Sequence, residues 1–314
     1  MERSRLLVTV RAEHGLRQAT GSLIITLGRK MKYTGFDRIN LIHDALCRLF
    51  GAIKFTRIRS EWPTFQIPEV NYPTQSDESI FIQKIAKIVA AHYRLDNTTF
   101  IVGFNSSLDA AAIVEIRNSD QIFIEYNHSG RINMVDLWPT LAHEIAHIYL
   151  NRLGIEYKET IQNEILTDTA TIILGFGHCY LSAQRKEVTG FSNSGTSYTT
   201  KSLGYLSPEE MGYILSIRDH IREENTFPLI HSDIGKNAYH KGRDRFEDEQ
   251  KLRPYISRGL FDRMMFKFGW QKSSDSEGYI FPCLVCKQMI RIPGIRKKLV
   301  VKCSNCNAAL TCYS

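Results

Sequence analysis

The spacing of apolar side chains along this chain of 314 residues predicts helices and strands in separate blocks. Five segments repeat apolar residues at helical spacing, and three shorter segments rich in Ile, Val and Phe predict strands. The expected helices are 36–50, 77–93, 137–150, 159–175 and 207–224, and the expected strands are 99–105, 110–117 and 121–126. A turn signal at 118–120 lies between the last two strands, so we expect a small antiparallel sheet before the third helix.

Breaks in this pattern divide the chain into four expected units. They are an N-terminal module over 1–76 with a strand-like stretch at 22–27, a domain over 77–232, a charged connector over 233–275 with a short amphipathic helix at 255–268, and a C-terminal module over 276–314. Ser207, Pro208 and Glu210 are typical of a helix N-terminus. Residues 189–202, rich in Gly, Ser and Thr, are expected to form a mobile loop over a cleft or a disordered insertion.

The third expected helix contains the sequence His143-Glu144-Ile145-Ala146-His147. On a helix this spacing puts two imidazoles one turn apart on one face, with a carboxylate beside them, which is half of a catalytic zinc site. The alternative without a metal is a pair of buried histidines whose hydrogen bonds are satisfied within a core helix. Glu144 argues against it, because a carboxylate on an otherwise apolar helix costs several kcal/mol to bury without compensation.

The next expected helix, 159–175, carries Glu164 and Asp168 four residues apart, so that both carboxylates face the same way. One of them can bind a metal while the other accepts the outer N–H of a ligand histidine. Gly175 and Gly177 are expected to end this helix. The residues considered as third ligand are Glu164, Glu156, Glu159, Asp168 and His178.

An H-E-x-x-H pair followed by N-E-x-x-x-D on a second helix resembles the gluzincin group of zincin metallopeptidases over residues 140–175. The resemblance implies that His143, His147 and Glu164 bind a catalytic zinc ion, that Glu144 is the general base, and that Asp168 supports a ligand histidine. A looser similarity is to cytoplasmic peptidases of the ImmA/IrrE type, although their usual sequence after the second carboxylate is absent. The expected fold class is α+β, with a zincin-like core.

A second zinc signature lies near the C-terminus. Two Cys-x-x-Cys pairs sixteen residues apart have the spacing of a closed structural zinc site, and residues 279–312 resemble a bacterial zinc ribbon. The four ligands are expected to be Cys283, Cys286, Cys303 and Cys306. Strands are expected at 288–292 and 299–301. The alternative, a pair of disulfides, is disfavoured because no secretory signal is visible.

Residues that follow the 159–175 helix are further candidates for chemistry. Cys179 follows it closely enough to reach the cleft and regulate the metal, and His178 or Tyr180 could donate to an oxyanion. Cys47 is expected to be a buried apolar residue, and Cys312 a thiol near the tail.

The net charge of +7 is concentrated near the C-terminus, where 278–314 holds six basic residues and no acidic one. They are Lys287, Arg291, Arg296, Lys297, Lys298 and Lys302. Such a patch suits either an acidic protein or nucleic acid. No apolar run long enough to span a membrane is seen, and together with reduced cysteines this predicts a cytoplasmic protein.

These observations predict a zinc-dependent endopeptidase that acts on a specific intracellular protein, in a regulatory, stress or phage-defence setting, with one catalytic and one structural zinc ion. Two alternatives stay open. One is a DNA-associated protease of the SprT/Spartan type, which also joins H-E-x-x-H to a ribbon but uses a third histidine soon after the motif. The other is a non-catalytic binding protein whose basic ribbon does the work.

Overall fold

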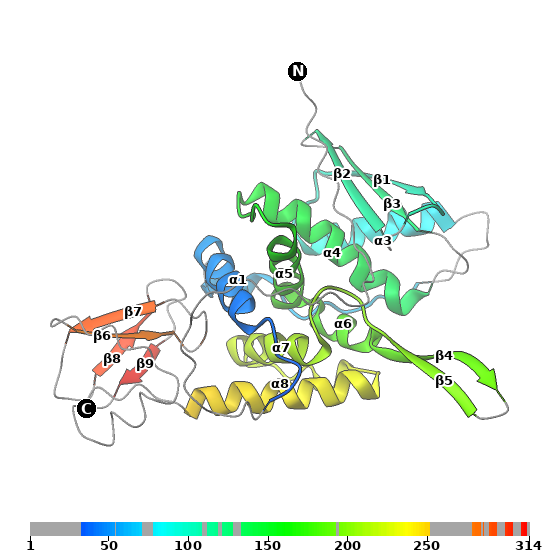
Figure 1. The fold of residues 1–314 in the computed structure, drawn as a ribbon. Coiled ribbons are helices and arrows are strands. Elements are labelled where there is room, and N and C mark those ends of the chain that lie inside the picture. Colours follow the sequence, from blue (N-terminus) through cyan, green and yellow to red (C-terminus); the bar gives the residue numbers. More distant parts are fainter. Residues whose placement is uncertain are drawn as a thin grey trace.

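The computed structural model describes residues 33–53, 55–70, 78–108, 112–118, 121–127, 133–192, 195–251, 278–283, 285, 289–293, 299–303 and 309–312. This part of the chain combines a largely helical body with small sheets, a mixture of helix and strand that fits the α+β class broadly (Figure 1). The strand-like stretch expected at 22–27 and the amphipathic helix expected at 255–268 lie outside the described residues.

The helical body is built on α4 (Met134–Arg152), which is buried along nearly its whole length. Asn133 caps its first turn, because the Asn133 side chain accepts a hydrogen bond from the Val135 N–H at 3.0 Å. α3 (Glu78–His92) and α5 (Thr160–Thr171) pack against it. The Tyr93 hydroxyl, just past α3, donates to the Ala142 carbonyl at 3.1 Å and ties α3 to the turn before His143.

The remaining helices enclose α5 and its continuation, α6 (Gly177–Ala183), and α1 packs directly on α5. They are α1 (Ile39–Ala52), α2 (Phe55–Glu61), α7 (Pro208–Arg222) and α8 (Asp233–Lys251). The apolar core is continuous from α1 through α4 and α7 to α8, and so it crosses the boundaries expected near residues 76 and 233. The expected capping box at Ser207 and Glu210 is confirmed at the start of α7.

A three-stranded sheet covers one side of α3 and α4 (Figure 1). Its strands are β1 (Thr99–Phe104), β2 (Ala112–Asn118) and β3 (Gln121–Tyr126). The expected hairpin of β2 and β3 is confirmed, but the expectation of a wholly antiparallel sheet was wrong. β3 lies in the centre and pairs parallel with β1, since the chain crosses the sheet between β1 and β2. A turn signal marks only the hairpin and says nothing about that crossing.

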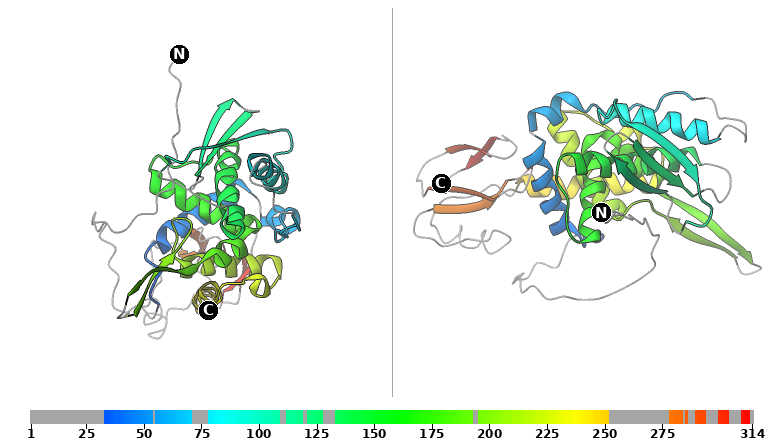
Figure 2. Two further views of the ribbon diagram at one scale, coloured as in Figure 1. Left: turned by 90° about the vertical axis from the view of Figure 1, so that its right-hand side faces the viewer. Right: turned by 90° about the horizontal axis from the view of Figure 1, so that it is seen from above.

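The segment expected as a loop, 189–202, instead lies largely within an antiparallel hairpin of β4 (Arg185–Ser192) and β5 (Gly195–Lys201). The hairpin extends away from the helical body (Figure 2). Its base is fixed by ion pairs, because Arg185 and Lys201 both contact Asp136 on α4, at 2.5 and 2.9 Å. A hairpin that projects into solvent needs no apolar periodicity, which explains why the sequence pattern missed it.

Two further hairpins near the C-terminus lie beside the helical body, at the opposite end from β4 and β5 (Figures 1 and 2). They pair β6 (Gly278–Pro282) with β7 (Met289–Pro293) and β8 (Leu299–Lys302) with β9 (Ala309–Cys312). The strands expected around 288–292 and 299–301 are therefore present. No helix in the described ranges is long and apolar enough to cross a membrane.

Candidate metal centre

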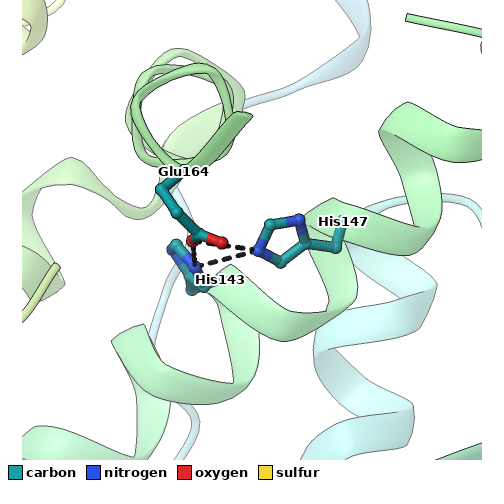
Figure 3. Close-up of side chains that lie close together, drawn as sticks. All are labelled: His143, His147 and Glu164. Atoms are coloured by element: carbon teal, nitrogen blue, oxygen red, sulfur yellow. Dashed lines mark hydrogen bonds and ion pairs between the residues drawn. The ribbon is translucent and has the colours of Figure 1, made fainter. Parts of the chain in front are cut away.

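Three buried side chains from α4 and α5 meet at one point (Figure 3). Glu164 Oε2 lies 3.0 Å from His143 Nε2 and 3.3 Å from His147 Nε2. The two Nε2 atoms are 3.1 Å apart. Among the described residues, these form the one group of His, Cys, Asp and Glu whose potential donor atoms all converge within metal-binding distance.

Both histidine rings are oriented by the partner of their other nitrogen. His143 Nδ1 lies 2.8 Å from Asp168 Oδ1, and His147 Nδ1 lies 3.0 Å from Thr167 Oγ1. Thr167 donates its own hydroxyl proton to the Asn163 carbonyl at 2.9 Å, so it accepts from His147. With a metal ion bound, each ring would carry its proton on Nδ1 and direct an Nε2 lone pair at the common point.

The three donor atoms fit a bound metal ion. Tetrahedral coordination at about 2.0–2.1 Å places donor atoms roughly 3.3 Å apart, close to the three separations seen here. Two imidazoles and a carboxylate suit several transition metals. Lone pairs and a carboxylate held this close repel one another unless a cation or a proton lies between them.

Without a metal, the carboxylates around His143 favour a proton in this position. Burial lowers the pKa of His143, but hydrogen bonds to Asp168 and Glu164 outweigh it and raise the pKa well above its ordinary value. Burial also lowers the pKa of His147, and the neighbouring His143 contributes to that shift. The centre thus stabilises one positive charge, and a metal ion would displace the proton that carries it.

Asp168 is held by donors on both oxygens. Its Oδ1 accepts from His143 Nδ1 and from the Tyr180 hydroxyl at 3.1 Å. Its Oδ2 accepts from the backbone N–H of Tyr205 at 2.6 Å and of Leu206 at 3.2 Å. Asp168 therefore contacts the ring nitrogen of His143 that faces away from the common point, as a supporting residue would.

Glu144 has no such partners. It is fully buried, and within the described part of the chain neither of its carboxylate oxygens has a hydrogen-bond partner. Burial raises the pKa of Glu144 to about 8, and the nearby Glu164 and Asp168 carboxylates add to the increase while His143 opposes it. A carboxyl group with no hydrogen-bond partner on either oxygen, next to His143 in sequence, is able to take up and release a proton.

A kink after α5 brings Tyr180 to the centre. The helix expected to end at Gly175 instead passes into a wide helical turn over 172–176, in which Gly175 has φ of 123°. The chain then continues as α6 from Gly177. The carbonyls freed by the kink are bonded by other elements: Ile173 by Arg218, Leu174 by His92 and Gly175 by the Phe65 N–H. Gly177 therefore continues the helix and does not end it.

The other candidate residues of the sequence lie elsewhere. Glu156 and Glu159 are exposed. His178 is buried with its Nε2 atom 3.4 Å from Cys179 Sγ, and burial together with Arg218 lowers the His178 pKa to about 4. Burial raises the pKa of the Cys179 thiol far above its ordinary value, so Cys179 is held as a neutral thiol.

Of the three residues predicted as oxyanion donors or regulators, only Tyr180 reaches the centre. Its hydroxyl lies 3.1 Å from His143 Nδ1, on the side of the ring that faces away from the common point. Two supporting groups were missed. Thr167 lies one helical turn from Glu164, a spacing that could have suggested it. The loop before α7 acts through backbone N–H groups, which no residue type reveals.

Two of the four cysteines predicted to form a zinc ribbon lie among the described residues. Cys283 follows β6 and Cys303 follows β8, so they occupy equivalent places in the two hairpins, and both are fully buried. Burial raises the pKa of Cys47 on α1, and Asp44, Cys303 and Cys283 add to the shift, which places Cys47 near this pair. Cys286 and Cys306 lie outside the described residues, so the four-cysteine site stays a prediction.

Comparisons of the chain with known protein families, with curated proteins and with solved structures found no match. The resemblance to zincins is therefore confined to the H-E-x-x-H motif and the second-helix carboxylates. The assignment of the centre rests on the geometry of its own residues.

Proposed function

We propose that this protein is a zinc-dependent endopeptidase, with His143, His147 and Glu164 as the ligands of the catalytic ion. The observation that carries the proposal is the combination of three converging donor atoms with an unpartnered buried carboxyl group beside them. A metal site that served the fold alone would have no use for Glu144, whose burial without hydrogen bonds costs several kcal/mol when it is ionised.

Zinc suits two imidazoles and one carboxylate and, when bound, supplies Lewis acidity that activates water and polarises a carbonyl group. The chain's own part in the reaction falls to Glu144, which accepts a proton from the attacking water and returns it to the departing amine. General acid–base transfer of this kind contributes about 100- to 10,000-fold in rate. Asp168 and Thr167 keep the two histidine rings oriented throughout.

The C-terminal hairpins fit a supporting role in the same proposal. Four thiolates would close a second zinc site and leave no position for chemistry. Their basic residues would then contact an acidic region of the protein substrate, with nucleic acid as the other candidate partner. We place the protein in the cytoplasm, where thiols such as Cys47 and Cys179 stay reduced.

One observation favours a non-catalytic alternative. The side chains of the centre are nearly inaccessible, with His147, at 7% exposure, the most accessible of the three donors. A metal ion enclosed in this way could act in folding alone while the basic ribbon binds a partner. The two functions differ in what Glu144→Gln changes, because the substitution removes a proton acceptor and no metal ligand.

The test compares new protein amino termini in cells that express wild-type protein, Glu144→Gln or the exposed control Glu69→Gln. We expect wild type and Glu69→Gln to generate the same new termini, and Glu144→Gln to generate none while it binds as much zinc as wild type. Termini that are unchanged by Glu144→Gln, or absent with wild type, would contradict a peptidase.

A further inference from the structure

The loop that joins β5 to α7 contacts the metal centre through its backbone. Tyr205 and Leu206 direct their N–H groups at Asp168 Oδ2, at 2.6 and 3.2 Å. The Tyr205 ring also lies nearly parallel to the His143 ring, with centroids 6.5 Å apart. Asp168 is fixed from one side by Tyr180 and from the other by this loop.

Gly204 makes this approach possible. Its φ of +83° is in the left-handed region, which side chains other than glycine rarely adopt. A Cβ atom at this position would lie 2.8 Å from Asp168 Oδ2, 3.0 Å from Oδ1 and 3.0 Å from Tyr180 Cε1. Any larger residue must push the Asp168 carboxylate or move the loop away from it.

The loop is anchored at both ends. Upstream, Lys201 at the end of β5 lies 2.9 Å from Asp136, on the helix that carries both histidines. Downstream, Ser207 begins the capping box of α7 and donates its hydroxyl to the Gly35 carbonyl at 2.5 Å. Between these anchors, Arg38 donates to the Tyr205 carbonyl. A loop held in this way can fix a carboxylate in one position.

We propose that the Gly204–Leu206 loop is a positioning element for the metal ligand His143, acting through Asp168. The proposal rests on the metal centre of the proposed function and adds a part of the chain that touches neither metal nor substrate. The loop aligns Asp168, Asp168 aligns the His143 ring, and the ring presents Nε2 to the ion.

The experiment measures zinc affinity by competition with a chromophoric chelator, using full-length protein and the zinc ion whose binding is lost in His143→Ala. Gly204→Ala should weaken this ion by about 10- to 100-fold, as loss of a supporting contact does. Gly154→Ala is the matched control, because Gly154 has φ of +68° but no atom within 4 Å of a Cβ. It should change the affinity by less than about two-fold.

A double-mutant cycle separates positioning from general damage. In an Asp168→Ala background the added Cβ no longer meets a carboxylate, so Gly204→Ala should have no further effect on zinc affinity. If Gly204→Ala lowers the affinity equally in both backgrounds, or no more than Gly154→Ala does, the loop is not a positioning element.

Tyr180→Phe extends the test without backbone strain, in case Gly204→Ala folds poorly. It removes one donor from Asp168 Oδ1 and should cause a smaller loss than Gly204→Ala does. Cobalt bound in place of zinc should show an altered visible spectrum in both variants. If wild type holds no zinc that depends on His143, the proposed function fails as well; if only the loop variants behave as wild type, this inference alone fails.

Discussion

The two sides of the His143 ring differ in how completely their polar groups are satisfied. On the Nδ1 side, Asp168 receives donors on both oxygens, from a histidine, a tyrosine and two backbone N–H groups. On the Nε2 side, Glu164 Oε1 and both oxygens of Glu144 have no partner within the described residues. The hydrogen bonds on the Nδ1 side fix the orientation of the ring. The carboxylate oxygens on the Nε2 side remain available for the metal ion and the proton transfer that we propose.

This difference explains why we assign different roles to Glu144 and Asp168, although both carboxylates are buried. Glu144 and Asp168 are both fully buried. Asp168 accepts hydrogen bonds from four donors, which hold its carboxylate in one orientation. Burial without any donor instead raises the pKa of Glu144 to about 8.

Glu164→Ala should abolish binding of the metal at this centre. The substitution removes one of three donors, and the two remaining imidazoles are too few to keep a metal ion bound in competition with water. Metal analysis of purified protein should therefore show one fewer zinc ion per chain than wild type, with the C-terminal site unaffected. Retention of the full zinc content would mean that another residue is the third ligand.

Asp168→Ala should leave zinc bound but weaken both its affinity and turnover by about 10- to 100-fold. Thr167→Val removes a neutral hydroxyl from His147 and should cost only about 1 kcal/mol, or roughly five-fold in affinity. Chelator competition ranks the two variants. If Asp168→Ala abolishes zinc binding while Glu164→Ala does not, Asp168 is the metal ligand and Glu164 the supporting residue.

The smallest expected effect is on the pH dependence of stability in the presence of a chelator. The folded-state pKa of His143 is raised, so its contribution is complete below its unfolded value near 6.5 and is lost as the pH rises. The Glu144 pKa, raised to about 8, acts in the same direction. Thermal unfolding temperatures should therefore fall as the pH rises above about 6.5, until the pH passes the raised pKa of each group. Added zinc should reduce the slope because the ion replaces the proton.

A slope that is the same with zinc and with chelator would contradict the idea that one cation, proton or metal, is required at this point. Glu144→Gln should also flatten part of the slope, since the amide cannot ionise. His147 does not contribute in this range, because its lowered pKa leaves it neutral in both the folded and the unfolded protein.

The sequence predicted the parts of this centre that depend on residue type and spacing. His143 and His147 are four residues apart on a helix, and so are Glu164 and Asp168, which brought all four to facing sides of α4 and α5. The contacts of Gly204, Tyr205 and Leu206 could not be predicted, because backbone N–H groups are common to every residue and their approach depends on tertiary packing.

The fold shows the same division. Helices with an apolar face and the β2–β3 hairpin followed from periodicity and a turn signal. The central position of β3 and the hairpin of β4 and β5 did not, because the first depends on a crossing connection and the second buries little apolar surface. The continuation of α5 into α6 past Gly175 depends on Arg218, His92 and Phe65, which are distant in sequence.

Anomalous diffraction at the zinc edge, from crystals of the full-length protein grown with zinc, would locate an ion at the proposed metal centre. We predict an anomalous peak for a zinc ion that His143 Nε2, His147 Nε2 and a Glu164 oxygen coordinate at about 2.0–2.2 Å. Asp168 should keep its hydrogen bond to His143 Nδ1. No peak among these three atoms, or an ion held there through Asp168 or Glu144 in place of Glu164, would contradict the account.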